Sequence, residues 1–365
     1  MNKLLKNGYA VIMAGGSGTR LWPLSRRDLP KQMQNFIGNK TLINETIERL
    51  YGFIDKNQIY ISTTANYVPK IKELLPEIPE ENIIVEPIAR GTTAAFALVA
   101  MTIKKRDPKA IILTIASDHS VTDIDEFHKS IYRMFSHVKN NPGDIVLIGI
   151  KPTRPDTGLG YIKIKNKLKP NSDANNKSLK VYLVEKFVEK PNRKVAEDYV
   201  NSENYFWNTA YYCFKAETLL EAYKDADPKI NEAVKKYLST GNIEDFAKVP
   251  SKNHEIEIID ASKHRLVMVP GNFTWKDIGS WQGIHEVLSG LHGQNLVTNS
   301  QKHVDIDSSN CLIFSNGEKL IATVNLDNLV IVDTKDVLLV INKNDSQDIK
   351  KLIEMIKTKN MSDYL

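Results

Sequence analysis

Cysteine is scarce in this chain of 365 residues, which contains Cys213 and Cys311. Two thiols far apart in the sequence exclude a four-cysteine metal site and a disulfide framework. Both lie among apolar residues, so we expect two buried free thiols. No apolar run approaches the length of a transmembrane helix, and the stretch after Lys3 and Lys6 is too short for a signal peptide. We therefore expect a cytoplasmic protein that does not bind membranes.

Dense tracts of lysine and arginine are absent as well. The formal net charge is +5, which is small for this length, and the sequence shows no sign of nucleic-acid binding. A modest positive bias suits anionic small molecules such as nucleotides and sugar phosphates. Hydrophobic residues make up 42% of the chain and charged residues 25%. These fractions are ordinary for a globular protein with one large or two moderate domains.

A glycine-rich turn follows a short apolar run near the N-terminus. The run 9–13 is typical of a buried strand. The turn consists of Ala14, Gly15, Gly16, Ser17, Gly18 and Thr19. Glycines let the backbone approach a bulky anion closely, and their N–H groups can point inward as donors. Arg20 and Lys31 add positive charge at the same end of the strand, so the pattern predicts a loop that binds phosphates.

Two common phosphate loops do not fit this turn. A P-loop needs Gly-Lys-Ser/Thr after four intervening residues, and the chain contains no such string. The dinucleotide fingerprint needs a third glycine where Leu21 stands. Taken alone, the glycines are explained equally well by a turn at the end of a strand that binds nothing.

Apolar strands and helices alternate after the turn. Segments typical of strands lie at 58–62, 83–85 and 110–115. Helical spacing predicts helices at 42–50, 67–75 and 92–105. Thr41 is the expected N-cap of the first helix. Strands that are apolar on both faces and alternate with helices indicate an α/β domain with a mostly parallel sheet. Ligands of such sheets bind beyond the carboxyl ends of the strands, where the glycine turn lies.

An acidic residue follows the strand at 110–115. Asp118 comes two residues after Ala116, and His119 follows it. A carboxylate at the carboxyl end of a strand, across from a phosphate loop, is well placed to hold Mg²⁺. The alternative is an aspartate that caps the next turn, beside a histidine that packs or hydrogen-bonds locally.

The character of the sequence changes after residue 294. Short β-branched runs occur at 311–314, 320–324, 329–332 and 337–341. Their spacing of roughly eight to ten residues predicts a small all-β module. Ser346, Gln347 and Asp348 then precede a predicted helix that ends near residue 357. We accordingly expect one domain at 1–294 and a second at 295–365.

The glycine turn and its continuation at 20–26 and 30–32 resemble the signature of the sugar-nucleotide pyrophosphorylases, and among them the mannose-1-phosphate guanylyltransferases. Similar blocks follow in the expected order from residue 9 to about 357, as in the short, single-function form of the family. The resemblance implies a Rossmann-like nucleotidyltransferase domain with a C-terminal β-helix-like module and a terminal helix. It further implies Mg²⁺ as cofactor and a homodimer formed through the C-terminal module.

The resemblance also implies which residues bind the nucleotide. Residues 14–19 would hold the triphosphate, with Arg20 and Lys31 as catalytic residues. Segment 86–95 resembles a second family block, in which Glu86, Arg90 and Thr92 bind the nucleotide, although Gly91 replaces the usual asparagine. The carboxylate of Glu86 can accept hydrogen bonds from the N1–H and the N2 amino group of guanine together. The alternative for this block is the start of a helix, with Thr92 as N-cap.

Sugar-phosphate and metal ligands complete the implied site. Gly160 would leave room for the sugar ring, Lys190 would bind the sugar phosphate, and Glu189 and Asn208 would bind sugar hydroxyls. Since neighbouring strand residues face opposite sides, the alternative leaves Glu189 or Lys190 exposed. A later block implies a second metal carboxylate.

That second carboxylate is Asp277, which would join Asp118 on Mg²⁺. The implied reaction forms GDP-mannose and pyrophosphate from GTP and α-D-mannose 1-phosphate. An anionic phosphate nucleophile needs alignment and charge neutralisation more than a general base. Two alternatives stay open, namely a guanylyltransferase for another sugar 1-phosphate such as a heptose phosphate, and a catalytically silent regulatory subunit that binds a sugar nucleotide.

Overall fold

The computed structural model describes residues 5–16, 18–36, 39–168, 181–255, 263–288, 295–298 and 302–365. It divides into two compact units. The first unit comprises Met1–Gly15, Arg49–Ala116 and Val121–Thr274. The second comprises Gly16–Glu48, Ser117–Ser120 and Trp275–Leu365. The glycine turn thus begins in the first unit and continues in the second.

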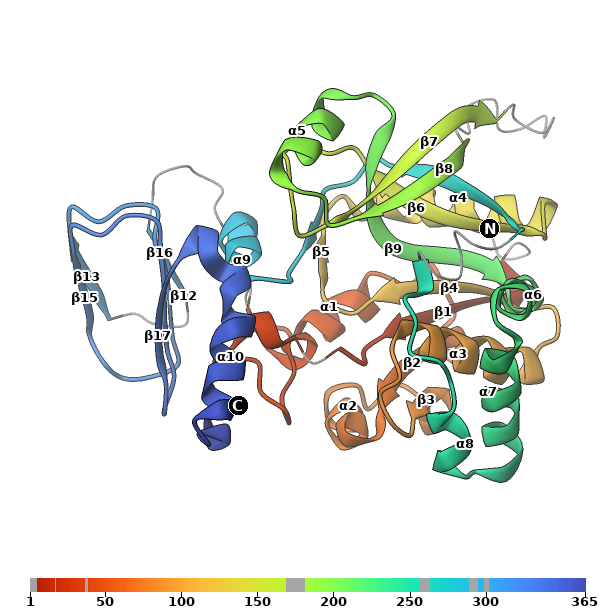
Figure 1. Cartoon of the computed structure of the whole chain (residues 1–365), viewed down its shortest axis with the longest axis horizontal. Helices are drawn as coiled ribbons and strands as arrows, with labels where there is room; N and C mark the ends of the chain where they lie inside the picture. The colour runs from red at the N-terminus through yellow and green to blue at the C-terminus, as the bar shows by residue number, and fades with distance from the viewer. Residues whose placement is uncertain are drawn as a thin grey trace. The chain divides into compact units, whose positions relative to one another are not determined.

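A mixed sheet forms the centre of the first unit (Figure 1). Its strands are β1 Gly8–Met13, β2 Ile59–Thr64, β3 Ile83–Glu86, β4 Ile111–Ala116, β6 Asp144–Ile150, β7 Gly160–Leu168, β8 Val181–Glu189, β9 Tyr205–Lys215 and β10 Arg265–Gly271. In the described part of the chain these nine strands have the order β3-β2-β1-β4-β9-β6-β10-β8-β7. β8 and β9 run opposite to the other seven. The predicted α/β class is confirmed.

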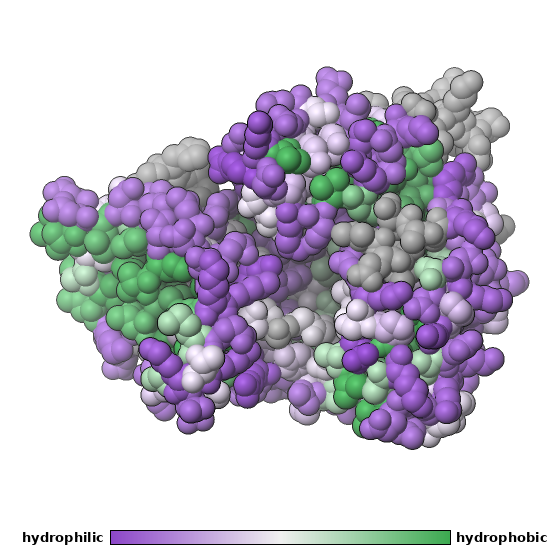
Figure 2. Space-filling model, viewed as in Figure 1, coloured by the Kyte–Doolittle hydropathy of each residue, from purple (hydrophilic) through white to green (hydrophobic). Residues whose placement is uncertain are grey.

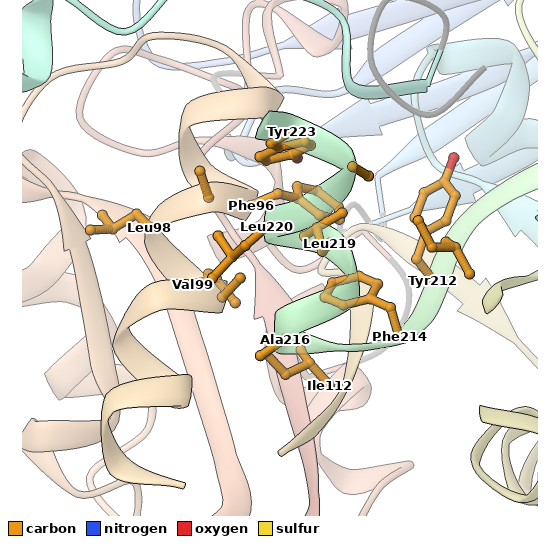
Figure 3. Close-up of a cluster of buried hydrophobic side chains, with 14 of the residues drawn as sticks. Phe96, Leu98, Val99, Ile112, Tyr212, Phe214, Ala216, Leu219, Leu220 and Tyr223 are labelled. Carbon is orange, nitrogen blue, oxygen red and sulfur yellow. The ribbon is translucent and has the colours of Figure 1, made fainter. Parts of the chain in front are cut away.

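Helices lie on both sides of this sheet (Figure 1). The helices of the first unit are α2 Val68–Leu74, α3 Thr92–Arg106, α4 Ile124–Asn140, α5 Arg193–Asn201, α6 Ala216–Ala226, α7 Pro228–Thr240 and α8 Ile243–Ala247. Side chains of α3, α6 and α7 join those of β4 and β9 in one buried apolar cluster, part of which Figure 3 shows. α4 packs on β6 and β10, and its buried side chains are not part of that cluster. β1 and β4 are almost wholly apolar and buried, which is the pattern expected of strands that helices cover on both faces.

Two predicted helix starts have different outcomes. α1 spans Leu42–Glu48, and the hydroxyl of Thr41 accepts a hydrogen bond from the N–H of Asn44 at 3.3 Å, so this cap is confirmed. The alternative that makes Thr92 an N-cap is wrong. Gly91 is the N-cap of α3 and Thr92 is its first helical residue. The Thr92 hydroxyl instead accepts from the N–H of His254 at 3.3 Å.

Parallel ladders dominate the C-terminal part of the second unit. Its strands are β12 Leu296–Thr298, β13 His303–Ile306, β14 Leu312–Ser315, β15 Ile321–Val324, β16 Leu329–Asp333 and β17 Leu338–Asn342. β12, β14 and β16 pair in parallel, as do β13 and β15, while β17 runs antiparallel to β16. The helix α10 Ile349–Thr358 follows. The predicted β-helix-like module with a terminal helix is therefore confirmed.

The segment after the glycine turn packs on this module within the second unit. One apolar cluster contains Leu21 and Trp22 together with residues of β14 and β16, α10, and the helix α9 Trp281–Leu288. The indole of Trp281 donates to the carbonyl of Trp22 at 3.1 Å, and Arg26 forms an ion pair with Asp336 at 2.8 Å. The predicted domain boundary at 294 falls beside residues outside the described ranges, so it stays a prediction.

Two expectations from composition can be compared with the structure. Cys213 and Cys311 are free and buried, as predicted. Among the helices that the structure describes, none combines the length and the apolar character needed to cross a membrane.

Candidate functional site

Several candidate residues lie at or just after the carboxyl ends of parallel strands in the first unit's sheet. β1 and β4 are parallel and in register, with Met13 opposite Ala116. β2 and β3 end in register as well, with Thr64 opposite Glu86. The glycine turn, the segment leading to Asp118 and the side chain of Glu86 therefore all follow the carboxyl ends of parallel strands, which is the edge that the sequence predicts.

Glu86 lies beside the start of the glycine turn. A Cβ atom on Gly15 would lie 3.3 Å from Oε1 of Glu86. The turn is fixed there by the N–H of Ala14, which donates to the Ser62 carbonyl at 2.7 Å, and by the Thr63 hydroxyl, which donates to the Ala14 carbonyl at 3.2 Å. Glu86 is 5% exposed, and burial raises its pKa to about 7. The ionised and neutral forms of this carboxyl are therefore present in similar amounts near neutral pH.

The later residues of the turn are held by contacts within the second unit. Gly18 has a φ of 62°, and a Cβ there would lie 2.6 Å from Cγ of Lys31, so a side chain at this position would be strained and would clash. The amide of Gln32 donates to the Gly16 carbonyl at 3.0 Å. Gln32 is buried, and a buried amide usually has a hydrogen-bonding partner; the sequence alone gives no sign of this contact. Ser17 lies outside the described residues.

The two predicted metal carboxylates come together in the second unit. The strands β5 His119–Val121 and β11 Trp275–Asp277 pair with each other, and the N–H of Ile278 donates to the Asp118 carbonyl at 3.2 Å. Lys31 forms an ion pair with Asp118, and its ammonium lies 3.9 Å from Oδ1 of Asp277. One ammonium therefore lies between two carboxylates that are far apart in sequence.

Opposite charge governs the protonation of this cluster. Burial acts to raise the pKa of Asp118, but the Lys31 ammonium and His119 together outweigh it and hold that pKa below its usual range. Burial acts to lower the pKa of Lys31, but Asp118 and Asp277 hold it above its usual value. Arg20 adds a further positive charge that acts on Lys31. Within the described residues the buried Nε of Arg20 has no hydrogen-bond partner.

Neighbouring groups support the carboxylates. The indole of Trp275 donates to Nδ1 of His119 at 3.2 Å, and Nε2 of His119 lies 3.8 Å from Asp118. A Cβ on Gly279 would lie 2.8 Å from Oδ2 of Asp277, so glycine is needed there to leave space for the carboxylate. The sequence analysis did not recognise this role of Gly279.

The donor set can be tested against Mg²⁺. In the described ranges there is no group of three or more histidine, cysteine, aspartate or glutamate side chains that could hold a metal ion. Mg²⁺ is usually bound through one or two carboxylates together with substrate phosphates and water. Asp118 and Asp277, which already share a cation in Lys31, fit that requirement.

Four predicted sugar-phosphate residues lie together in the first unit. Gly160 of β7 pairs with Glu189 of β8. A Cβ on Gly160 would lie 2.9 Å from Oε2 of Glu189 and 3.7 Å from Cβ of Asn208 on β9. Lys190 forms an ion pair with Glu189. Lys190 has a φ of 45° directly after the end of β8, so the alternation of a strand does not extend to it. Both side chains are exposed, Glu189 at 37% and Lys190 at 45%, which agrees with the alternative of an exposed residue in this pair, and their binding to the sugar phosphate stays a prediction.

A β-bulge shapes the strand that carries Asn208. The register between β6 and β9 shifts between Leu147 and Gly149, and Ala210 has a φ of 55°. The Asn208 side chain accepts from the N–H of Ala210 at 3.0 Å and donates to the Tyr212 hydroxyl at 3.3 Å. Tyr212 thus contacts the predicted sugar ligand Asn208, and the sequence gives no sign of this contact because Tyr212 looks like an ordinary core aromatic.

Arg90 and Thr92 contact a later segment of the first unit. The guanidinium of Arg90 donates to the Val249 carbonyl at 3.1 and 2.8 Å. Thr93 donates to the Lys252 carbonyl at 2.8 Å. The Thr92 hydroxyl accepts a hydrogen bond from the N–H of His254. Their binding to a nucleotide stays a prediction, and the structure adds that this block holds the segment 249–254.

Known proteins resemble the chain along nearly its whole length. A sequence model of the family described as nucleotidyl transferase matches residues 9–294. A second one, described as the MannoseP isomerase/GMP-like beta-helix domain, matches residues 301–356.

Individual relatives agree with these matches. A mannose-1-phosphate guanylyltransferase of Klebsiella pneumoniae is 35% identical over 97% of this chain and 75% of its own length. One from Escherichia coli strain K12 is 33% identical over 96% of this chain and 73% of its own length. A crystal structure from Thermus thermophilus, described as a mannose-1-phosphate geranyltransferase, is 28% identical with a TM-score of 0.85 and covers 96% of this chain and 99% of that one.

Proposed function

Because the chain belongs to the nucleotidyl transferase family, among the mannose-1-phosphate guanylyltransferases, we propose that it converts GTP and α-D-mannose 1-phosphate into GDP-mannose and pyrophosphate. The observation that carries this proposal is the cluster of Lys31, Asp118 and Asp277, with Arg20 acting on it. A protein that only bound a sugar nucleotide would not need two carboxylates that share one cation.

The reaction follows from the charges of the two substrates. An oxygen of the sugar phosphate attacks the α-phosphorus of GTP, and the bond from that phosphorus to the bridging oxygen breaks. The electron pair leaves with pyrophosphate. Since the nucleophile is already an anion, no general base is required, and catalysis depends on alignment and charge neutralisation. Arg20 and Lys31 offset the charge of the triphosphate and of the departing pyrophosphate.

Asp118 and Asp277 are the residues that would hold Mg²⁺. A bound Mg²⁺ would supply further positive charge to the phosphate oxygens. Lys31 already lies between the two carboxylates. We infer that its ammonium partly relieves their mutual repulsion and remains close to the phosphates that it helps to neutralise.

The sugar phosphate would bind at Gly160, Glu189, Lys190 and Asn208. Lys190 pairs with Glu189 in the structure, and a phosphate would compete for its ammonium. Glu189 would then be released to accept hydrogen bonds from sugar hydroxyls. The missing side chain at Gly160 leaves space beside Glu189 and Asn208 for the ring.

Guanine would be recognised at Glu86. Its buried carboxyl lies beside Gly15. Gly15 belongs to the glycine turn that would hold the phosphates of the same nucleotide. The ionised carboxylate can accept from both N–H groups of guanine. Adenine would place a lone pair against it, and such an unpaired buried contact costs about 1–3 kcal/mol.

A homodimer is the proposed assembly. Large apolar side chains that are more than half exposed gather on β13, β15 and β17 and beside β15. They are Val304, Ile306, Leu320, Val324, Leu338 and Val340, with exposed fractions of 54–64%; we call them the apolar patch. Figure 2 shows hydrophobic surface over these strands. Exposed patches of this kind mark protein interfaces, which supports the C-terminal module as the contact between two copies.

Pyrophosphate release with a panel of nucleotides and sugar 1-phosphates tests the proposal. We expect GTP with mannose 1-phosphate to give the highest kcat/KM. Clear preference for a heptose phosphate, glucose 1-phosphate or UTP would contradict it. If no pair releases pyrophosphate while GDP-mannose still binds, the chain is instead a regulatory subunit.

A further inference from the structure

Arg26 and Asp336 form an ion pair that links the segment after the glycine turn to the C-terminal module, and the predicted site includes neither of them. We propose that this pair positions Arg20, so that Arg26 and Asp336 are positioning residues for the binding of the triphosphate and the departure of pyrophosphate. The inference rests on the proposed function, because it takes Arg20 as a ligand of those phosphates. All the residues involved belong to the second unit.

The guanidinium of Arg26 has a defined position. Its two terminal nitrogens donate to the two carboxylate oxygens of Asp336 at 3.2 and 2.8 Å. Nη1 also donates to the Tyr364 carbonyl at 2.7 Å, and Nε donates to the Pro23 carbonyl at 2.6 Å. Four of the five N–H groups of the guanidinium are therefore engaged, by groups from three separate segments.

The pair fixes geometry more than it adds stability. Arg26 is 18% exposed and Asp336 is 43% exposed, and an ion pair in contact with solvent contributes little to the free energy of unfolding. A bidentate pair of a guanidinium with a carboxylate nevertheless sets a direction as well as a distance. Asp336 lies in the turn between β16 and β17, which the N–H of Thr334 closes by donating to the Val337 carbonyl at 2.9 Å. The C-terminal module thus presents the carboxylate from a fixed turn.

The Tyr364 carbonyl joins Arg26 to Trp22. The indole Nε1 of Trp22 donates to the same oxygen at 2.6 Å, so this oxygen accepts one hydrogen bond for each of its two lone pairs. Trp22 is buried, and its own carbonyl accepts from the indole of Trp281 at 3.1 Å. The ion pair therefore helps to hold the acceptor that fixes Trp22, two residues after Arg20.

Trp22 in turn fixes the backbone that carries Arg20. The short 3₁₀ turn Thr19–Leu21 ends at Trp22, whose N–H donates to the Thr19 carbonyl at 3.1 Å. α10 packs on the same turn. Among the described residues the buried Nε of Arg20 has no hydrogen-bond partner. Because no bond of this nitrogen holds the side chain, the position of the guanidinium follows the backbone, and a displaced Trp22 would displace Arg20.

Other contacts hold the rest of the charged cluster. The ammonium of Lys31 pairs with Asp118, lies 3.9 Å from Asp277, and donates to the Ile278 carbonyl at 3.2 Å. None of these contacts involves the segment 22–26 or the turn between β16 and β17. Loss of the ion pair should therefore misalign Arg20 and leave the predicted metal carboxylates in place.

Steady-state kinetics and calorimetric binding of GTP test the proposal. Asp336→Ala should lower kcat about tenfold and raise the Kd for GTP about fivefold, because a charged ligand of the phosphates is no longer aligned. The KM for the sugar 1-phosphate should stay within about twofold, since its predicted ligands belong to the first unit. Asp336→Glu keeps both acceptor oxygens and should restore most of kcat. Arg26→Lys keeps the charge without the planar fork and should behave like Asp336→Ala.

A double-variant cycle with Arg20→Ala separates positioning from general damage. If the ion pair acts through Arg20, Asp336→Ala should lower kcat by less than about twofold once Arg20 is already alanine. Two independent losses would instead multiply. A double variant whose kcat falls by the full product of the two single effects would overturn the inference.

Lys319→Ala is the matched control. It removes another ion pair of the C-terminal module, between Lys319 and the buried Asp333 at 2.9 Å, and leaves Arg26 and Asp336 intact. Its Tm should fall at least as far as that of Asp336→Ala, while its kcat and its Kd for GTP stay at the wild-type values. Light scattering should give both variants the wild-type mass.

Three results would overturn the inference, namely unchanged kcat and Kd for GTP in Asp336→Ala, the same kinetic losses in Lys319→Ala, or a changed mass that accompanies the loss of activity in Asp336→Ala. A wild type that releases no pyrophosphate contradicts the proposed function alone. The Kd for GTP in Asp336→Ala, compared with that in Lys319→Ala, then decides the inference.

Discussion

Glu86 combines deep burial with a pKa near neutrality, so its ionisation should control nucleotide binding. Its pKa of about 7 follows from burial. Because only the ionised carboxylate accepts both guanine N–H groups, we expect the KM for GTP to fall as the pH rises from about 6 to about 8. Glu86→Gln should remove this dependence and lower the preference for GTP over ATP at least about tenfold. A variant with the wild-type pH profile and nucleotide preference would remove Glu86 from the base site.

The same residue should affect stability with a definite sign. A carboxyl whose pKa rises on folding, here from 4.5 to about 7, binds its proton more tightly in the folded state. It therefore destabilises the fold increasingly as the pH rises from 4.5 to about 7 and adds no penalty below that range. Glu86→Gln should raise the free energy of unfolding at about pH 8 by up to about 3 kcal/mol and leave it unchanged at low pH. Urea unfolding at both pH values measures this, and equal differences at both would contradict it.

The asparagine variants of Asp118 and Asp277 should differ in stability but lose activity to a similar extent. Substitution of either by asparagine removes one of the two proposed metal carboxylates and should cut turnover at least about a hundredfold. Asp118 pairs directly with the largely buried Lys31, whereas Asp277 lies 3.9 Å from its ammonium. Asp118→Asn should therefore cost roughly 1–3 kcal/mol of stability, and Asp277→Asn clearly less. Near-normal turnover of either variant at saturating Mg²⁺ would refute the two-carboxylate site.

Residue chemistry explains which parts of the site the sequence can reveal. Asp118 can be proposed from the residues alone, because it follows an almost wholly apolar strand. Asp277 depends on a resemblance, since only the pairing of β5 with β11 brings it to Lys31. Tyr212, which contacts Asn208, shows no local signal, because it is an aromatic residue in a mostly apolar strand.

At the scale of elements, the start of α3 depends on Gly91. Its backbone has φ 83° and ψ 175°, a conformation that is almost exclusive to glycine. Replacing it by the asparagine usual in the family should destabilise the protein by about 1–3 kcal/mol. Gly143→Asn is the control, because nothing lies within 4 Å of a Cβ there and no left-handed φ is present. If both variants have the same Tm, the strain argument at Gly91 fails.

Element types follow from the sequence more readily than strand directions. β1, β2, β3 and β4 form parallel pairs, and their apolar runs and intervening helices predict this. β9 runs antiparallel between β4 and β6. Its sequence, which is mostly aromatic and apolar, does not encode the direction in which it enters the sheet. That direction is set by long-range pairing, which places Asn208 and the bulge at Ala210.

At the scale of the whole molecule, the proposed dimer depends on the apolar patch of the C-terminal module. Ile306 of β13 and Val324 of β15 are register partners, with exposed fractions of 62% and 55%. Two such residues side by side form a surface that a second copy can cover through the same residues, as a two-fold interface requires. Burial of this patch contributes about 25 cal/mol for each Å² covered, so two charges placed within it should be enough to separate the copies.

The double substitution Ile306→Glu with Val324→Glu should therefore convert the dimer to monomers while leaving the fold intact. Both side chains point to solvent within one copy, so glutamate is tolerated there, whereas at an interface it would remain desolvated and unpaired. Lys351→Glu on α10, which is 79% exposed and lies outside the patch, adds negative charge as a control and should stay dimeric. Light scattering coupled to gel filtration gives the masses. A monomeric wild type would refute the dimer, and a double variant that keeps the wild-type dimer mass would show that the copies meet elsewhere.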